Sequence, residues 1–183
     1  EDKKNYEAQS DWKIAQATVK SLEDFKKFRD KYFKTETGKL YETADFHEKW
    51  INSIVDAIKH GKQQMILSPP RHGKTDLLIH FAVWQICKNP NIRIMWVGGN
   101  EDIAKNAVGG VLDHLENNES LNEDINGPGI KFQPKVRSGK SWSSGQFTVG
   151  TRTVTGIKSP TMVAVGKGGK ILSRDCDLII ADD

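Results

Sequence analysis

The chain has 183 residues, of which 37% are hydrophobic and 28% are charged, and its formal net charge is +3. This length and composition are typical of one soluble globular domain with its own core. No apolar run approaches the roughly 20 residues that a membrane helix needs, and no secretory signal opens the sequence. The two cysteines, Cys87 and Cys176, form no disulfide framework and no metal-ligand pattern. Collagenous, disulfide-stapled and integral-membrane classes are therefore excluded, and a cytosolic protein is favoured.

The positive charge is concentrated in one segment. No Asp or Glu lies between Ile125 and Arg174, so this segment is strongly basic while the rest of the chain is net acidic. A block of one sign this long favours a surface that meets phosphate groups, and a solvated set of strands and loops is the alternative. The nine cations of the segment are Lys131, Lys135, Arg137, Lys140, Arg152, Lys158, Lys167, Lys170 and Arg174.

The first third of the chain is predicted to be helical. Apolar residues recur every three or four positions from Asp11 to Tyr32, which is typical of an amphipathic helix. After a polar break at Thr35–Tyr41, a second helix is predicted from Asp45 to about His60, ending at Gly61. We expect a helical N-terminal extension over residues 1–40 and one domain over residues 41–183.

Strands and helices then alternate. A short strand is predicted at Gln64–Leu67, a helix at Lys74–Lys88, a strand at Ile92–Val97 and a helix at Glu101–Asn117, for which Asn100 is the N-cap. This order indicates an α/β protein with a parallel sheet and right-handed crossovers.

The last third is predicted to consist of strands and turns, after a loop at Asn117–Pro134. Strands are expected at Gly145–Thr155 and Thr161–Val165, with a turn at Gly166–Gly169. The final apolar strand, Asp177–Ala181, leads directly into Asp182 and Asp183.

The strongest local motif is Ser68-Pro-Pro-Arg-His-Gly-Lys-Thr75. It lies between a predicted strand and a predicted helix, which is the context of a phosphate-binding loop whose backbone N–H groups face the β-phosphate. Gly73 lets the main chain approach closely, Lys74 reaches the β- and γ-phosphates, and the Thr75 hydroxyl can bind Mg²⁺. Ser68 stands where the usual pattern has its first glycine. The motif predicts ATP and Mg²⁺ as ligands.

The carboxylates after the last strand fit the same site. Ligands of parallel sheets bind at the carboxyl edge of the strands, so Asp182 is predicted to hold the Mg²⁺ shell together with Thr75. Asp183 is predicted to orient and deprotonate the water that attacks the γ-phosphate, a role for which glutamate is the commoner residue. A solvated turn after a strand is the alternative for both.

The stretch from Phe46 to Asp183 resembles the ATPase domain of the large terminase subunit of tailed phages, which packages DNA into the procapsid. The matching features are an aromatic-His pair ahead of a helix, the Pro-Pro-Arg-His-Gly-Lys-Thr form of the Walker A loop, Trp84 followed by Asn89-Pro90, and a final Asp-Leu-Ile-Ile-x-Asp-Asp strand. The resemblance implies a P-loop NTPase fold of the additional-strand, RecA-like class. In that fold a mostly parallel central sheet is flanked by helices.

The resemblance also implies residue roles. Arg71 is expected to sense or stabilise the phosphates, whereas His72 is expected to matter through its backbone. The segment around Phe46, His47 and Trp50 resembles an adenine-contacting region, although an exposed helix residue is an equal interpretation of His47. Ring-forming motors of this family supply an arginine to the neighbouring subunit. Arg174 is the candidate ahead of Arg152 and Arg137, and an ordinary surface cation is the alternative for each. The expected catalytic residues are Lys74, Asp183, Arg71 and Arg174, and the expected ATP-binding residues are Ser68, Pro69, Pro70, Arg71, His72, Gly73, Lys74, Thr75, Phe46 and His47.

A packaging motor must contact the DNA backbone without reading bases. Lys167 and Lys170, which flank the glycines of a turn, are the candidate DNA contacts, and keeping a hairpin soluble is the alternative. The resemblance implies double-stranded DNA, the portal protein and the small terminase subunit as partners. It also implies a homo-oligomeric ring on the portal and a location in the host cytoplasm.

Large terminase subunits continue past this strand into a nuclease domain. We therefore expect a C-terminally truncated fragment that hydrolyses ATP weakly on its own. Two other functions fit the same residues: a helicase-like P-loop ATPase, and a nucleotide-gated binding module with little turnover.

Overall fold

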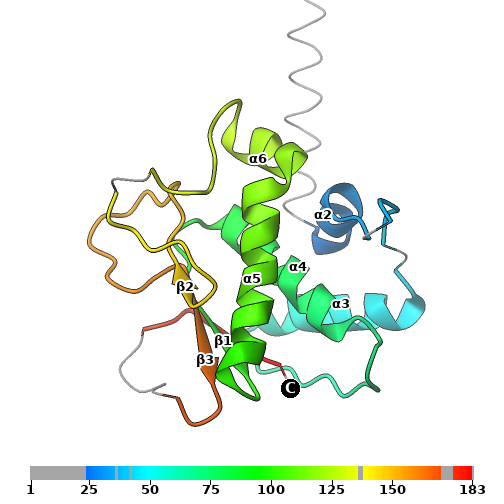
Figure 1. Ribbon diagram of the computed structural model, residues 1–183. Coiled ribbons are helices and arrows are strands. Elements are labelled where there is room, and N and C mark those ends of the chain that lie inside the picture. The colour runs from blue at the N-terminus through cyan, green and yellow to red at the C-terminus, as the bar shows by residue number, and fades with distance from the viewer. Residues whose placement is uncertain (1–23, 36, 42, 136–137, 170–174, 183) are drawn as a thin grey trace, which may run out of the picture. The chain divides into compact units, whose positions relative to one another are not determined.

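The computed structural model describes residues 24–182, apart from residues 36, 42, 136–137 and 170–174 (Figure 1). The chain divides into two compact units, Glu1–Lys74 and Thr75–Asp183. The domain boundary that we expected after residue 40 falls inside the first unit.

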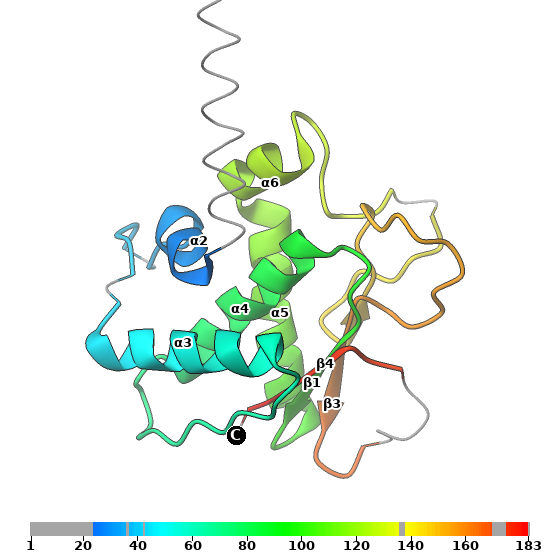
Figure 2. The ribbon, with the colours of Figure 1, turned by 180° about the vertical axis from the view of Figure 1, so that it is seen from behind.

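The first unit contains helices α2 (Phe25–Tyr32) and α3 (Asp45–Lys59), which contact each other (Figure 2). Asp24 has an extended backbone and its side chain accepts a hydrogen bond from the Lys27 N–H, so α2 begins there. The single helix predicted from Asp11 to Tyr32 is therefore wrong at this point, and its part before residue 24 lies outside the described residues. The helix predicted at Asp45–His60 is confirmed as α3.

The strand predicted at Gln64–Leu67 is not formed, since these residues have no regular secondary structure. The side chains of Met65 and Leu67 are 77% and 86% exposed. A strand requires a hydrogen-bonding neighbour, and an apolar run alone does not supply one.

The second unit is built on a four-stranded sheet in the order β2-β3-β1-β4. Strand β1 (Ile94–Gly98) pairs in parallel with β3 (Met162–Gly166) on one side and with β4 (Leu178–Ala181) on the other. The short strand β2 (Gln146–Phe147) pairs antiparallel with β3. The α/β class is thus confirmed.

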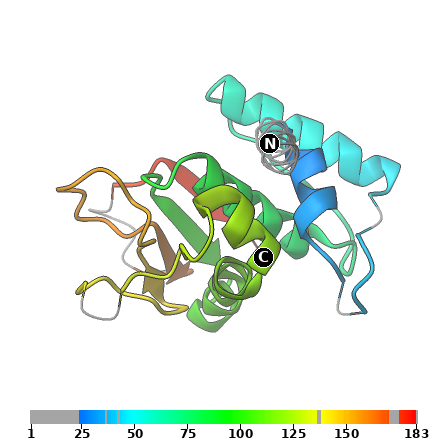
Figure 3. The same cartoon turned by 90° about the horizontal axis from the view of Figure 1, so that it is seen from above.

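Helices cover one face of this sheet (Figures 1 and 3). Helices α4 (Lys74–Lys88) and α5 (Glu101–Asn117) have the bounds predicted for them, and α5 contacts both β1 and β3. Asn100 caps α5 as expected, because its side chain accepts a hydrogen bond from the Ile103 N–H. The Trp96 side chain is fully buried, whereas Met95, which alternates with it along β1, packs with Val163 on the opposite face.

Glycines at the carboxyl ends of β1 and β3 let α5 begin very close to the sheet. A Cβ atom added to Gly166 would lie 2.5 Å from the Glu101 nitrogen, and one added to Gly98 would lie 2.8 Å from the Ala104 nitrogen. Both distances are shorter than a Cβ atom tolerates, so only glycine fits at these two strand ends.

Two predictions in the last third are wrong. The strand expected at Gly145–Thr155 is limited to β2, because the backbone after Phe147 bonds to loop partners; the Gly150 N–H, for example, donates to the Phe132 carbonyl. The loop expected at Asn117–Pro134 contains helix α6 (Glu119–Asn126), capped by the Asn118 side chain, with Leu121 fully buried.

No helix within the described part of the chain is both long and apolar enough to cross a lipid bilayer.

Candidate functional site

The loop before α4 has an unusual backbone. Arg71 and Gly73 have φ angles of +65° and +69°, and Arg71 is the non-glycine residue with positive φ among those described. Left-handed residues that alternate with ordinary ones turn successive N–H groups toward one side, which makes a concave site for anions. A non-glycine residue held in this region costs roughly 1 kcal/mol or more and often marks a functional loop. The loop also closes on itself, since His72 Nδ1 donates to the Pro70 carbonyl at 2.9 Å.

Aromatic side chains of α3 lie against this loop within the first unit. The Phe46 ring centre is 4.2 Å from that of His47, 5.1 Å from that of Trp50 and 5.8 Å from that of His72. The two residues that we expected near adenine therefore contact the loop before α4, through His72.

His47 joins the start of α3 to the loop through both ring nitrogens. Its Nδ1 accepts a hydrogen bond from the Ala44 N–H at 3.3 Å, and its Nε2 donates to the His72 carbonyl at 2.8 Å. An N–H group can only donate and a carbonyl can only accept, so these partners fix the neutral tautomer with its proton on Nε2. His47 is half-buried rather than exposed, and it contacts the loop before α4.

In the second unit, Thr75 and Asp182 meet directly although 107 positions separate them. The Thr75 hydroxyl donates to Asp182 Oδ2 at 2.8 Å. Thr75 lies in the first turn of α4, and Asp182 follows β4, whose ladder continues through a hydrogen bond from the Asp182 N–H to the Val97 carbonyl. Asp182 is buried. The expected proximity of these two side chains is thus present.

The pair fits a magnesium ion. A hydroxyl and a carboxylate are hard oxygen ligands of the kind that Mg²⁺ prefers. Across the described ranges, no three His, Cys, Asp or Glu side chains gather closely enough to hold a metal by themselves. An ion at Thr75 and Asp182 would take its other ligands from phosphate oxygens and water, as Mg²⁺ commonly does.

Lys167 lies at the same edge of the sheet as Asp182. It follows the last residue of β3, its N–H donates to the Gly98 carbonyl, and its side chain is exposed. The other predicted DNA contact, Lys170, lies outside the described residues, as do Asp183, Arg174 and Arg137.

Arg152, the second candidate for an arginine given to a neighbouring subunit, is engaged within its own loop. Its guanidinium donates to the Ser159 carbonyl at 2.8 Å and to the Thr161 hydroxyl at 3.1 Å. Partial burial lowers the pKa of Arg152 from its ordinary value, and the nearby Arg93 charge acts in the same direction. Arg152 therefore holds two loop segments together.

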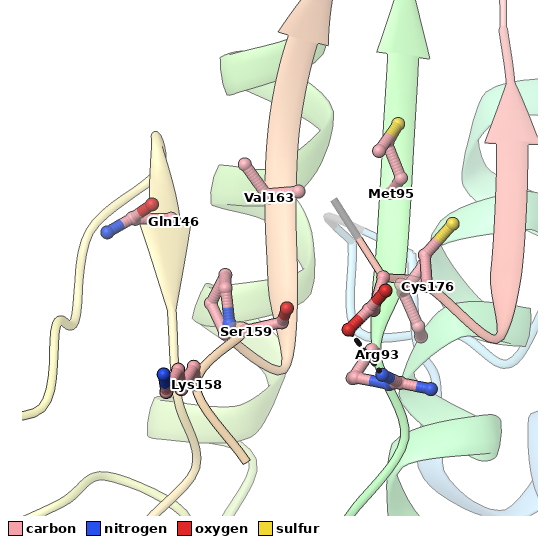
Figure 4. A pocket seen from close by; sticks show the side chains of 10 residues that line it. Arg93, Met95, Gln146, Lys158, Ser159, Val163 and Cys176 are labelled. Carbon is pink, nitrogen blue, oxygen red and sulfur yellow. Dashed lines mark ion pairs between the residues drawn. The ribbon is translucent and has the colours of Figure 1, made fainter. Parts of the chain in front are cut away.

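The amino ends of the strands, opposite Thr75 and Asp182, carry a different set of side chains. At the amino ends of β1 and β3, Arg93, Lys158, Gln146 and Cys176 line a cavity of about 220 Å³ (Figure 4). Arg93 makes two side-chain hydrogen bonds to Asp177, of 2.6 and 3.0 Å, and these bonds hold the pKa of the Asp177 carboxyl below its usual value. These amino ends are far from Thr75 and Asp182 along the strands. The Arg93–Asp177 ion pair joins the residue before β1 to the residue before β4.

Sequence reasoning missed the role of His47 toward the loop and the Arg93–Asp177 pair. The sequence offers one signal for the role of His47. It stands three residues after the N-cap of α3, a position whose side chain can accept a hydrogen bond from the N-cap N–H. No comparable signal precedes the Arg93–Asp177 pair.

No protein-family model matches this chain, and no curated protein matches it significantly. The fold and the contacts described above are therefore what bears on its function.

Proposed function

We propose that this chain is the ATPase motor portion of a terminase-like DNA-packaging protein, which couples hydrolysis of Mg-ATP to translocation of double-stranded DNA into a procapsid. The observation that carries the proposal is the hydrogen bond from Thr75 to Asp182. It joins the residue after Gly73-Lys74 to the acid that ends a parallel strand, and a Mg-nucleotide site needs these two groups together.

Each part of the site has a role in this proposal. The loop with Arg71 and Gly73 in left-handed conformations binds the phosphates through its N–H groups. Lys74 binds the β- and γ-phosphates, and Thr75 and Asp182 hold Mg²⁺, which neutralises charge on the transferred phosphate when it is bound. Asp183 orients and deprotonates the attacking water, and Arg174 acts on the nucleotide of a neighbouring subunit in a ring.

The proposed partners follow from the same reading. Lys167 and Lys170 contact the phosphate backbone of duplex DNA without reading its sequence. The portal protein and the small terminase subunit dock the ring on the procapsid in the host cytoplasm.

Nucleotide binding with and without Mg²⁺ tests the proposal. We expect wild-type protein to bind ATP more tightly when Mg²⁺ is present, because Thr75 and Asp182 would hold the ion and the ion would offset phosphate charge. Lys74→Ala should lose binding in both conditions. Asp182→Asn and Thr75→Val should lose only the gain that Mg²⁺ gives, whereas Thr75→Ser, which keeps the hydroxyl, should retain it.

Asp175→Asn is the matched control, since it removes one carboxylate charge at the opposite edge of the sheet, where the Asp175 side chain is 84% exposed. It should bind Mg-ATP as the wild type does. Wild-type protein that binds no ATP, or an Asp182→Asn variant with an undiminished response to Mg²⁺, would contradict the proposal.

A further inference from the structure

We propose that His47 is a positioning residue: it holds the phosphate loop by the His72 carbonyl and thereby sets affinity for the polyphosphate rather than for the base. This inference rests on the proposed nucleotide site and assigns to His47 a role other than the adenine contact expected from sequence.

The bond from His47 to the loop controls the direction of a donor. The peptide bond between His72 and Gly73 is trans and planar, so its C=O and N–H groups point in opposite directions. When His47 Nε2 holds the His72 carbonyl on the α3 side, at 2.8 Å, the Gly73 N–H must point away from α3. An N–H group fixed in direction before binding loses no freedom when it meets a phosphate oxygen.

The imidazole ring is itself held in place. Its Nδ1 is fixed by the Ala44 N–H, and its ring centre lies 4.2 Å from that of Phe46 and 5.4 Å from that of Trp50. A Cβ atom added to Gly73 would lie 3.6 Å from His47 Nε2, so the ring directly abuts the loop backbone.

The same geometry argues against a polar contact from His47 to adenine. Both ring nitrogens already have backbone partners, and the neutral ring has no third polar atom to offer a base. Arg71 has a left-handed backbone conformation, which a non-glycine residue keeps only when neighbouring groups fix it. Contacts from outside the loop, such as the bond from His47, are therefore required.

Two substitutions separate the bonds that His47 makes. His47→Asn places an amide oxygen near the position of Nδ1, so it keeps the bond from Ala44 but is too short to reach the His72 carbonyl. His47→Gln places an amide nitrogen near the position of Nε2, so it restores the donor to His72. His60→Asn, an exposed change at the other end of the α3 region, is the control.

Affinities are measured for Mg-ATP and for inorganic tripolyphosphate, which has no base. We expect His47→Asn to weaken both ligands by a similar factor, roughly tenfold, as for loss of one well-placed hydrogen bond. His47→Gln should recover most of both affinities, and His60→Asn should leave both at the wild-type value. Circular dichroism and a denaturation midpoint for each variant show that it is folded.

Other results overturn the inference in distinct ways. If His47→Asn bound ATP more weakly but bound tripolyphosphate normally, His47 would be a contact to the adenine base. If His47→Asn and His47→Gln lost affinity equally, or if neither lost affinity, the bond to the His72 carbonyl would not set polyphosphate affinity. Failure of the wild type to bind either ligand would instead contradict the proposed function, and the inference would fall with it.

Nitrogen NMR of the imidazole gives a readout that does not depend on a ligand. We expect the free protein to carry its His47 proton on Nε2, with Nδ1 unprotonated. A proton on Nδ1 alone would overturn the inference whatever the affinities are.

Discussion

Gly166 controls the distance between the end of β3 and the start of α5. Glu101 and Asn100 pack directly over the Gly166 Cα, at the edge of the sheet where Asp182 and Lys167 also lie. A single methyl group therefore has no space unless the first turn of α5 moves.

We expect Gly166→Ala to lower the free energy of unfolding by about 1–3 kcal/mol, the usual cost of overpacking a close contact. The matched control is Gly109→Ala in α5, where the new Cβ would meet Ser144 at an ordinary 3.7 Å. That change should raise stability by up to about 1 kcal/mol, because alanine favours helix more than glycine does. Denaturant titration of both variants checks the opposite signs, and a Gly166→Ala variant as stable as the wild type would contradict the close packing.

At the scale of elements, α4 and α5 pack through a pair of histidines. The rings of His80 and His114 lie edge to face with centres 5.4 Å apart, and His80 is buried. Burial lowers the pKa of His114 below its ordinary value of 6.5, although Asp113 on α5 and Asp76 on α4 act in the opposite direction. The folded protein thus favours neutral His114 more than the unfolded chain does.

This difference predicts how stability depends on pH. Because the pKa is lower in the folded state, the unfolded chain takes up the proton first as pH falls. The contribution of neutral His114 to stability should be complete above about pH 7 and decline as pH drops below about 6.5. Unfolding free energies measured between about pH 7.5 and 5.5 should fall less steeply for His114→Gln than for the wild type. Identical slopes for His114→Gln and the wild type would contradict the prediction.

Elements with strong internal signals were predictable from the sequence. Helices α3, α4 and α5 have apolar residues at helical spacing and clear ends, such as the Asn100 cap, and the structure has them at those positions. Helix α6 escaped detection because only Leu121 and Ile125 in it are apolar, and its Asn118 cap is a weak signal alone.

Features that depend on a distant partner were harder to predict. The run Gln64–Leu67 is apolar enough for a strand, but strand formation depends on a neighbour that the run itself does not specify. The meeting of Thr75 with Asp182 was predictable, because carboxyl ends of parallel strands share one edge. The bond from His47 to the His72 carbonyl was not, since it requires the relative placement of a helix and an irregular loop.

At the scale of the whole molecule, two exposed lysines of the acid-free segment, Lys158 and Lys167, lie at opposite ends of the strands of the second unit's sheet. Lys158 lines the cavity at the amino ends of the strands, whereas Lys167 follows the carboxyl end of β3. The five residues of β3 separate the two edges by about 17 Å at the usual rise per residue. A DNA duplex held at the carboxyl ends of the strands, near Asp182, would therefore meet Lys167 and not Lys158.

This separation makes the proposed DNA contact testable with a control from the same segment. Each phosphate neutralised by a lysine adds about 0.9 to the slope of log affinity against log salt, because counterions are released from the duplex. Lys167→Ala should weaken binding of duplex DNA of any sequence and reduce that slope by about 1. Lys158→Ala removes the same charge from the opposite edge and should leave the slope at the wild-type value. Fluorescence anisotropy with a labelled duplex at several salt concentrations measures both variants. Equal reductions would mean that the duplex senses only the summed charge of the segment, and a reduction for Lys158→Ala alone would move the DNA to the amino edge, away from Thr75 and Asp182.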